Sequence, residues 1–133
     1  MKGWIGVDLD GTLAQYDHWR GIEHIGEPVM PMLERVKRWL AAGYDVRIFT
    51  ARVDGGNVAV SMGDQNGIAH RDVAAVRQHI EAWCLKHIGQ IIPVTNVKDY
   101  GMEELWDDRA VQVEANTGRV LGYSRRGLHD PAA

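Results

Sequence analysis

The chain has 133 residues, of which 45% are hydrophobic, and this length and composition fit one globular domain with a single core. Its 15 basic and 18 acidic residues give a formal net charge of -3, which argues against electrostatic binding to nucleic acid or to an anionic membrane. The single cysteine, Cys84, excludes an internal disulfide and a cysteine-rich zinc site, and we interpret it as a small buried hydrophobic residue.

The apolar stretches of the chain are short. Aspartates interrupt the N-terminal run before it reaches the length of a signal peptide, and no later run approaches the length of a membrane span. We therefore expect a soluble, cytoplasmic protein that has no membrane partner. The pattern predicts one domain over residues 1–124 and a loosely ordered C-terminal tail over 125–133, which contains glycine, proline and alanine.

The first third of the chain predicts a strand, a helix and a second strand. Residues 4–7 form a short apolar run that is typical of a strand buried on both faces. Apolar residues recur at helical spacing over 31–42, with Pro31 suited to the first turn and Gly43 to the position after the last. Residues 44–50 then alternate as a second strand.

A glycine-rich loop is expected over 53–70, of a length that is often functional. A second helix follows over 71–88 and a third strand over 91–95, which Pro93 shortens or places at a sheet edge.

The last part of the domain is less regular. A short turn is expected over 102–104, after which Leu105 and Trp106 lead into two aspartates. Alternating apolar residues on either side of an Asn-Thr-Gly sequence predict a terminal β-hairpin over 111–121.

The alternation of strands and helices predicts an α/β fold with an open, mainly parallel, Rossmann-like sheet and helices on both faces. Ligands of such sheets bind beyond the carboxyl ends of the strands. Polar residues follow each predicted strand end: Asp8, Asp10, Thr50, Lys98, Asp107 and Asp108. No glycine-rich dinucleotide or phosphate-loop motif is present, so the chemistry must lie in these side chains.

Several carboxylates at one edge repel one another unless a hard cation neutralises them, and oxygen ligands favour Mg²⁺. A lysine and a threonine hydroxyl beside that metal suit a phosphoryl group, which predicts that Lys98 and Thr50 bind phosphate. With no Ser-His or Cys-His arrangement evident, an aspartate is the available nucleophile. Asp8 and Asp10 point the same way from an extended segment, so one can attack phosphorus while the other exchanges protons.

These residues resemble the four ordered motifs of the haloacid dehalogenase (HAD) superfamily of phosphohydrolases. The similarity lies in the segment Val7-Asp8-Leu9-Asp10-Gly11-Thr12-Leu13, in Thr50, in Lys98 and in Trp106-Asp107-Asp108-Arg109, and it spans Gly3 to Val113.

The resemblance implies that Asp8 is the nucleophile and Asp10 the general acid and base. It also implies that Thr50, with its neighbour Ala51, and Lys98 bind phosphate. Mg²⁺ would be held by the Asp8 carboxylate, the Asp10 carbonyl oxygen, Asp108 as the closer of the last two aspartates, and Asp107 as its support.

The intervals 13–29 and 53–70 are too short for the inserted cap domain of larger members, so the chain resembles a small capless type. The first interval would form a flap, and the second a partial lid. Side chains expected to contact the leaving group are Tyr16, Asp17, His18, Trp19, Arg20 and, after Thr50, Arg52. The alternative for the flap residues is a solvated loop with one packed aromatic side chain.

The expected substrate is a small phosphomonoester such as a nucleotide or a sugar phosphate. The Ala-Gln-Tyr-Asp run and Thr50-Ala51-Arg52 resemble the phosphatase domain of polynucleotide kinases, which favours a nucleic-acid end, whereas the negative charge opposes it. An open site also leaves room for a neighbouring copy of the chain, in a homo-oligomer, to close it.

Two other classes of protein share part of this pattern. A receiver-type phosphoacceptor domain also places acidic residues, a threonine and a lysine at strand ends, but its adjacent acidic pair follows the first strand, whereas here it comes last. A non-catalytic module that binds Mg²⁺ and phosphate is the second alternative. The tryptophans Trp4, Trp39, Trp83 and Trp106 occupy predicted core positions, so we interpret them as packing residues.

Overall fold

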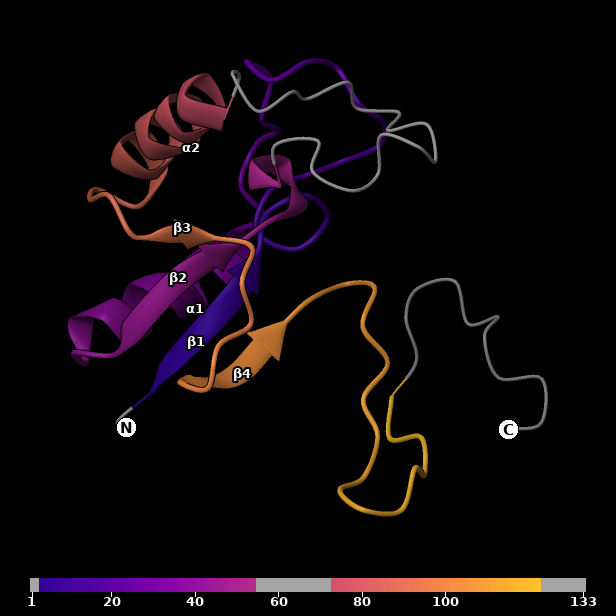
Figure 1. Ribbon diagram of the computed structural model, residues 1–133. Coiled ribbons are helices and arrows are strands. Elements are labelled where there is room, and N and C mark those ends of the chain that lie inside the picture. Colours follow the sequence, from indigo (N-terminus) through magenta and orange to yellow (C-terminus); the bar gives the residue numbers. More distant parts are fainter. Residues whose placement is uncertain (1–2, 55–72, 123–133) are drawn as a thin grey trace.

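The computed structural model describes residues 3–54 and 73–122 (Figure 1). In chain order, the elements are β1 (Trp4–Asp8), α1 (Met30–Ala41), β2 (Asp45–Phe49), the short 3-10 helix η1 (Ala51–Val53), α2 (Val73–His87), β3 (Val94–Thr95) and β4 (Met102–Trp106). Most of the loop expected over 53–70, the first two residues of the helix expected over 71–88, and the tail 125–133 lie outside the described residues.

The strands form one four-stranded sheet in the order β3-β2-β1-β4, and every neighbouring pair is parallel. This confirms the predicted α/β fold with a parallel sheet. The chain passes from β1 through β2 to β3 in one direction and then returns to place β4 on the other side of β1. The strand order therefore reverses between β1 and β4, and the carboxyl ends of strands beside such a reversal are where open α/β sheets bind ligands.

The edge strands differ in length from the sequence prediction. The turn expected over 102–104 is wrong, because Met102–Trp106 form β4. Glu103 and Glu104 are exposed on this edge strand, so its sequence lacks the apolar run that marks an interior strand. β3 is only Val94–Thr95, and it begins directly after Pro93, which has no backbone N–H to donate.

Helix α1 begins and ends close to where the sequence predicts. Pro31 occupies its first turn, and the chain leaves the helix through Gly43, which has a φ of +87° that residues with a side chain rarely adopt. Met32, Leu33 and Val36 are buried and form its inner face. Neither α1 nor α2, nor any other helix among the described residues, is long and apolar enough to cross a membrane.

The core lies on one face of the sheet. Val46 and Ile48 of β2 are buried, and they pair in register with Ile5 and Val7 of β1. These side chains and the inner faces of α1 and α2 belong to one buried cluster. The alternate residues of β2 are exposed or partly exposed, and Figure 1 shows the strands in front of α1. No helix covers that open face among residues 3–54 and 73–122, so a second helical layer stays a prediction.

The tryptophans pack as predicted. Trp4 and Trp83 are buried, and Trp39 and Trp106 are packed against the core with their ring centroids 5.1 Å apart in an edge-to-face contact. Cys84 is also buried, and this burial raises the pKa of its thiol to about 11, as expected for a packing residue.

The segment after β4 turns back on itself. Val113 and Val120 form a single antiparallel bridge, closed by a turn in which Asn116 has a φ of 65° and Gly118 a φ of 76°. The hairpin expected over 111–121 thus contains one bridge rather than two strands in the described part of the chain.

Candidate active site

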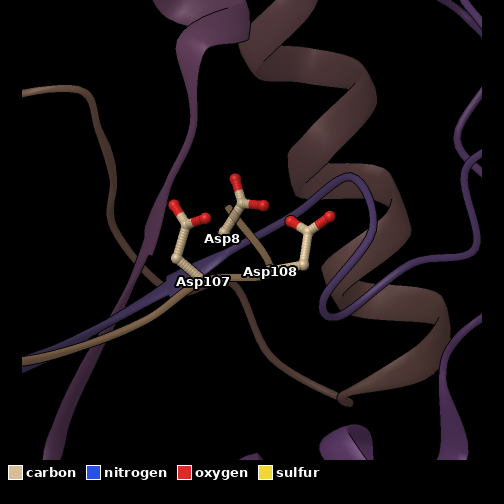
Figure 2. Close-up of side chains that lie close together, drawn as sticks. All are labelled: Asp8, Asp107 and Asp108. Carbon is tan, nitrogen blue, oxygen red and sulfur yellow. The ribbon is translucent and has the colours of Figure 1, made fainter. Parts of the chain in front are cut away.

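Three aspartates meet where β1 and β4 end. Asp8 is the last residue of β1, and Asp107 and Asp108 follow β4 directly. Each offers a carboxylate oxygen within 4.8 Å of the others, and Figure 2 shows the three side chains close together with their carboxylates pointing in similar directions. The parallel pairing of β1 with β4 therefore unites residues from opposite ends of the chain, as the sequence predicts.

Thr12 connects the two strand ends. Its Oγ1 accepts a hydrogen bond of 3.0 Å from the backbone N–H of Asp108, and it lies 3.4 Å from Oδ2 of Asp8 and 3.3 Å from Oδ1 of Asp108. Gly11 makes room for this approach, because a Cβ atom at its position would lie 2.5 Å from Oδ2 of Asp108. The Gly-Thr sequence after Asp10 therefore sets the position of Asp108 relative to Asp8.

The electrostatics of Asp8 follow from its neighbours. Burial, reinforced by Asp107, Asp108 and Asp10, raises the pKa of Asp8 to about 8. Without a cation, this environment favours the protonated form of the carboxyl group. A cation among the carboxylates would favour their ionised forms.

Asp10 has a different environment, although it lies only two residues from Asp8. Its Oδ2 accepts a hydrogen bond of 2.7 Å from Nε of Arg52, and its Oδ1 accepts one of 2.8 Å from Nη2. Arg52 is 4% exposed, so this two-bond ion pair is largely removed from water. The carboxylate of Asp10 is consequently paired with a cation, while that of Asp8 lies among other carboxylates.

The segment between β1 and α1 contacts the other side of Arg52. Nη2 of Arg52 donates a 3.0 Å hydrogen bond to the carbonyl oxygen of His24, and the guanidinium lies 4.9 Å from the centroid of the Trp19 ring. A hydrogen bond of 2.9 Å from the indole of Trp83 to the carbonyl oxygen of Gly26 anchors the same segment to α2. The interval 13–29, expected from the sequence to form a flap and called the flap from here on, is thus attached to the body of the protein partly through Arg52.

A pocket of about 280 Å³ adjoins the aspartates. Its lining combines two of the three clustered aspartates with cationic, hydroxyl and aromatic residues: Asp8, Asp10, Tyr16, Trp19, Phe49, Thr50, Ala51, Arg52, Asp107 and Arg109. Thr50 is buried, and its Oγ1 accepts a 3.2 Å hydrogen bond from the backbone N–H of Arg52 at the start of η1.

The donor set suits a hard divalent cation. Asp8, Asp107 and Asp108 offer only oxygen atoms, they are partly exposed, and they border an open pocket that can admit water and a further oxygen ligand. Mg²⁺ favours oxygen ligands and usually keeps several of its waters, so these residues fit it. The side chain of Asp10 is not a member of this group and is paired with Arg52.

Most of the predicted site residues gather around the pocket; the four exceptions are Lys98, Arg20 and the exposed Asp17 and His18. The predicted residues that line it are Asp8, Asp10, Tyr16, Trp19, Thr50, Ala51, Arg52 and Asp107, and Asp108 adjoins it through the carboxylate cluster. Lys98 is exposed and lines a neighbouring groove of about 700 Å³, which shares Asp107 with the pocket. Arg20 is exposed and pairs with Asp17 within the flap at 2.7 Å.

The sequence did not indicate the place of four residues of the site. It did not single out Phe49 or Arg109, which both line the pocket, and it gave Thr12 no role beyond the motif. It named Arg52 only as a candidate specificity residue and did not foresee its pairing with Asp10. Arg109 could have been predicted as a site residue because it directly follows Asp107 and Asp108 in the sequence. Nothing in the spacing of Asp10 and Arg52 indicates their contact.

Comparison of the chain with protein-family models, with curated proteins and with solved structures finds no match.

Proposed function

We propose that this protein is a Mg²⁺-dependent phosphatase of the HAD type, which hydrolyses a phosphomonoester through an aspartyl-phosphate on Asp8. The main observation that supports this proposal is the group of Asp8, Asp107 and Asp108. It lies where the strand order reverses, between β1 and β4, beside a pocket that is also lined by Asp10. A phosphatase of this type needs a carboxylate nucleophile, oxygen ligands for a cation and a second, separately held carboxylate, and all three are adjacent here.

In the first step, a carboxylate oxygen of Asp8 attacks phosphorus, and the bond from phosphorus to the ester oxygen breaks. This step requires Asp10 to carry a proton, which it gives to the departing oxygen, so an alcohol leaves and an acyl phosphate remains on Asp8. Bound Mg²⁺, held by Asp8, Asp107 and Asp108, would supply positive charge next to the phosphoryl oxygens and the ionised carboxylates.

In the second step, water attacks the phosphorus of the acyl phosphate. Asp10 takes a proton from that water, the bond between phosphorus and the Asp8 oxygen breaks, and inorganic phosphate leaves. Both aspartates return to their starting protonation states, so the cycle can repeat. Thr50 and Lys98 are proposed to bind the phosphoryl oxygens, Thr50 from within the pocket and Lys98 from the groove that shares Asp107.

The pocket suits a small phosphomonoester. Its volume of about 280 Å³ leaves room for a phosphoryl group and a modest leaving group, and Tyr16, Trp19 and Phe49 supply apolar surface for the latter. A nucleotide or a sugar phosphate therefore remains the proposed substrate class.

The test is a phosphatase screen with Mg²⁺ across an aryl phosphate, sugar phosphates, nucleotides and 3'-phosphorylated oligonucleotides. We expect repeated turnover of at least one ester, loss of activity in EDTA, recovery with added Mg²⁺, and no activity in Asp8→Asn. Capture of one phosphoryl group per protein, with release of one alcohol and no further turnover, would instead favour a receiver-type acceptor. Binding of phosphate without any release from esters would favour a non-catalytic module.

A further inference from the structure

We infer that Arg52 is a positioning residue for the proposed acid-base residue Asp10, and that the flap in turn holds Arg52, which links the flap to the proton-transfer steps. The inference rests on the proposed function, since it concerns how Asp10 performs its part. The inference goes beyond the proposed function because it assigns roles to a buried arginine and to the flap. The reaction scheme itself requires neither role.

The first support is geometric. Nε and Nη2 of Arg52 bind both carboxylate oxygens of Asp10, at 2.7 and 2.8 Å, so the plane of the carboxylate is fixed and not only its location. A lysine at this position would give a single point of attachment and could not fix that plane.

The second support is the way in which Arg52 is itself held. The guanidinium is clamped between Asp10, the carbonyl oxygen of His24 and the Trp19 ring, and its Nη1 is buried without a hydrogen-bond partner among residues 3–54 and 73–122. Leaving such a group unpaired costs about 1–3 kcal/mol in general. A buried arginine that served only the fold would be expected to pair all of its N–H groups, so this placement favours a role at the site.

The third support is the connection to the flap. Trp19 and His24 both belong to the flap, and Trp19 also lines the pocket next to Asp10. A displacement of the flap by a leaving group would therefore act on Arg52 and, through it, on the orientation of Asp10.

The experiment compares Arg52→Met, Arg52→Lys and Asp10→Asn on esters of good and poor leaving groups. Proton donation matters most when the leaving group is poor, and general acid-base catalysis is worth roughly 10²- to 10⁴-fold. We expect Arg52→Met to lower kcat/KM for an alkyl phosphate by about 10²-fold or more, with a loss of only a few fold for an activated aryl phosphate. We expect Arg52→Lys to remain close to Arg52→Met, because charge alone does not orient a carboxylate.

A double variant decides whether Arg52 acts through Asp10. If it does, Arg52→Met added to Asp10→Asn should cause little further loss on the alkyl phosphate. Arg47→Met is the matched control, because Arg47 makes a similar two-bond pair with Asp45 and lies 4.7 Å from the Trp4 ring, on the open face of the sheet. It should hydrolyse both esters as the wild type does.

Several results would overturn the inference. Equal losses on both esters, additive losses in the double variant, or full rescue by Arg52→Lys would each show that Arg52 does not orient Asp10. If Arg52→Met fails to fold, Trp19→Leu tests the same link, because removal of the ring should give the same dependence on the leaving group with a smaller loss. A wild type that hydrolyses no ester would overturn the proposed function, and this inference with it.

Discussion

The backbone N–H of Asp108 donates a 3.0 Å hydrogen bond to Oγ1 of Thr12, which connects the end of β4 to the loop after β1. The two residues are far apart in the sequence, yet this contact sets the position of Asp108 beside Asp8. The spacing of the proposed cation ligands thus depends on one hydroxyl group.

Replacement of Thr12 by valine keeps the shape of the side chain and removes that hydroxyl. We expect Thr12→Val to lower the free energy of unfolding by about 1 kcal/mol and to weaken Mg²⁺ binding, because the N–H of Asp108 loses its partner. Urea unfolding and a Mg²⁺ titration measure the two effects. Thr12→Ser retains the hydroxyl and should bind Mg²⁺ as the wild type does; equal weakening in both variants would contradict the role of the hydrogen bond.

The cluster of Asp8, Asp107 and Asp108 predicts which carboxylates hold the cation. A bound cation stabilises the folded state, so Mg²⁺ should raise the Tm of the wild type. We expect Asp108→Asn to reduce this rise more than Asp107→Asn, because Asp108 is the predicted closer ligand. Thermal unfolding over a range of Mg²⁺ concentrations provides the measurement.

Asp45→Asn serves as the control for that titration, since Asp45 pairs with Arg47 on the open face of the sheet. Its Tm should rise with Mg²⁺ by the same amount as that of the wild type. A rise that survives in both Asp107→Asn and Asp108→Asn would place the cation elsewhere.

The raised pKa of Asp8 predicts a pH dependence of stability in the metal-free protein. The folded-state pKa is about 8, whereas an aspartate in the unfolded chain titrates near its ordinary value of 3.8. Between these values the folded state binds more protons than the unfolded state, so the contribution of Asp8 to stability falls as pH rises. It is fully present below the unfolded pKa and lost as pH passes through the folded pKa.

Asp8→Asn removes this contribution. In EDTA, the difference in unfolding free energy between Asp8→Asn and the wild type should therefore shift in favour of the variant from about pH 5 to about pH 8. Urea unfolding at the two pH values measures this difference. An unchanged difference would contradict the raised pKa.

Variants of Lys98 and Arg109 test which positively charged side chain binds the phosphoryl group. Loss of one preorganised charge at a developing anion commonly costs about 10²- to 10³-fold in kcat. We expect a loss of that size in Lys98→Met with an intact fold, since this lysine is exposed and contributes little to the core. Steady-state kinetics on an aryl phosphate give the result. Full activity in Lys98→Met, with a large loss in Arg109→Met, would transfer the role to Arg109, which lines the pocket.

The sequence predicted the parts of the site that depend on strand ends. Asp8 ends β1 and Asp107 follows β4, and parallel pairing brings residues at such strand ends together whatever the connecting loops do. The position of Lys98 is harder to foresee, because two residues separate it from a strand of only Val94–Thr95, so the connecting loop sets its place. The pairing of Asp10 with Arg52 depends on side-chain packing against the flap, which has no periodic signature.

In the fold, too, some elements could be predicted from the sequence and others could not. Helix α1 has apolar residues at clear helical spacing, and Pro31 and Gly43 mark its two ends, so its bounds were predicted to within one residue. The full extent of β4 was not, because an edge strand needs little apolar sequence, and Glu103 and Glu104 gave the appearance of a turn.

The most direct test of the account is detection of the phosphorylated protein. Wild-type protein mixed with excess aryl phosphate and Mg²⁺, then quenched rapidly in acid, should gain the mass of one phosphoryl group, which peptide mapping places on Asp8. The adduct should be sensitive to hydroxylamine, as an acyl phosphate is, and absent in EDTA and in Asp8→Asn. Turnover of the ester without any phosphoryl group on Asp8, or an adduct that persists in Asp8→Asn, would contradict the proposed role of this residue.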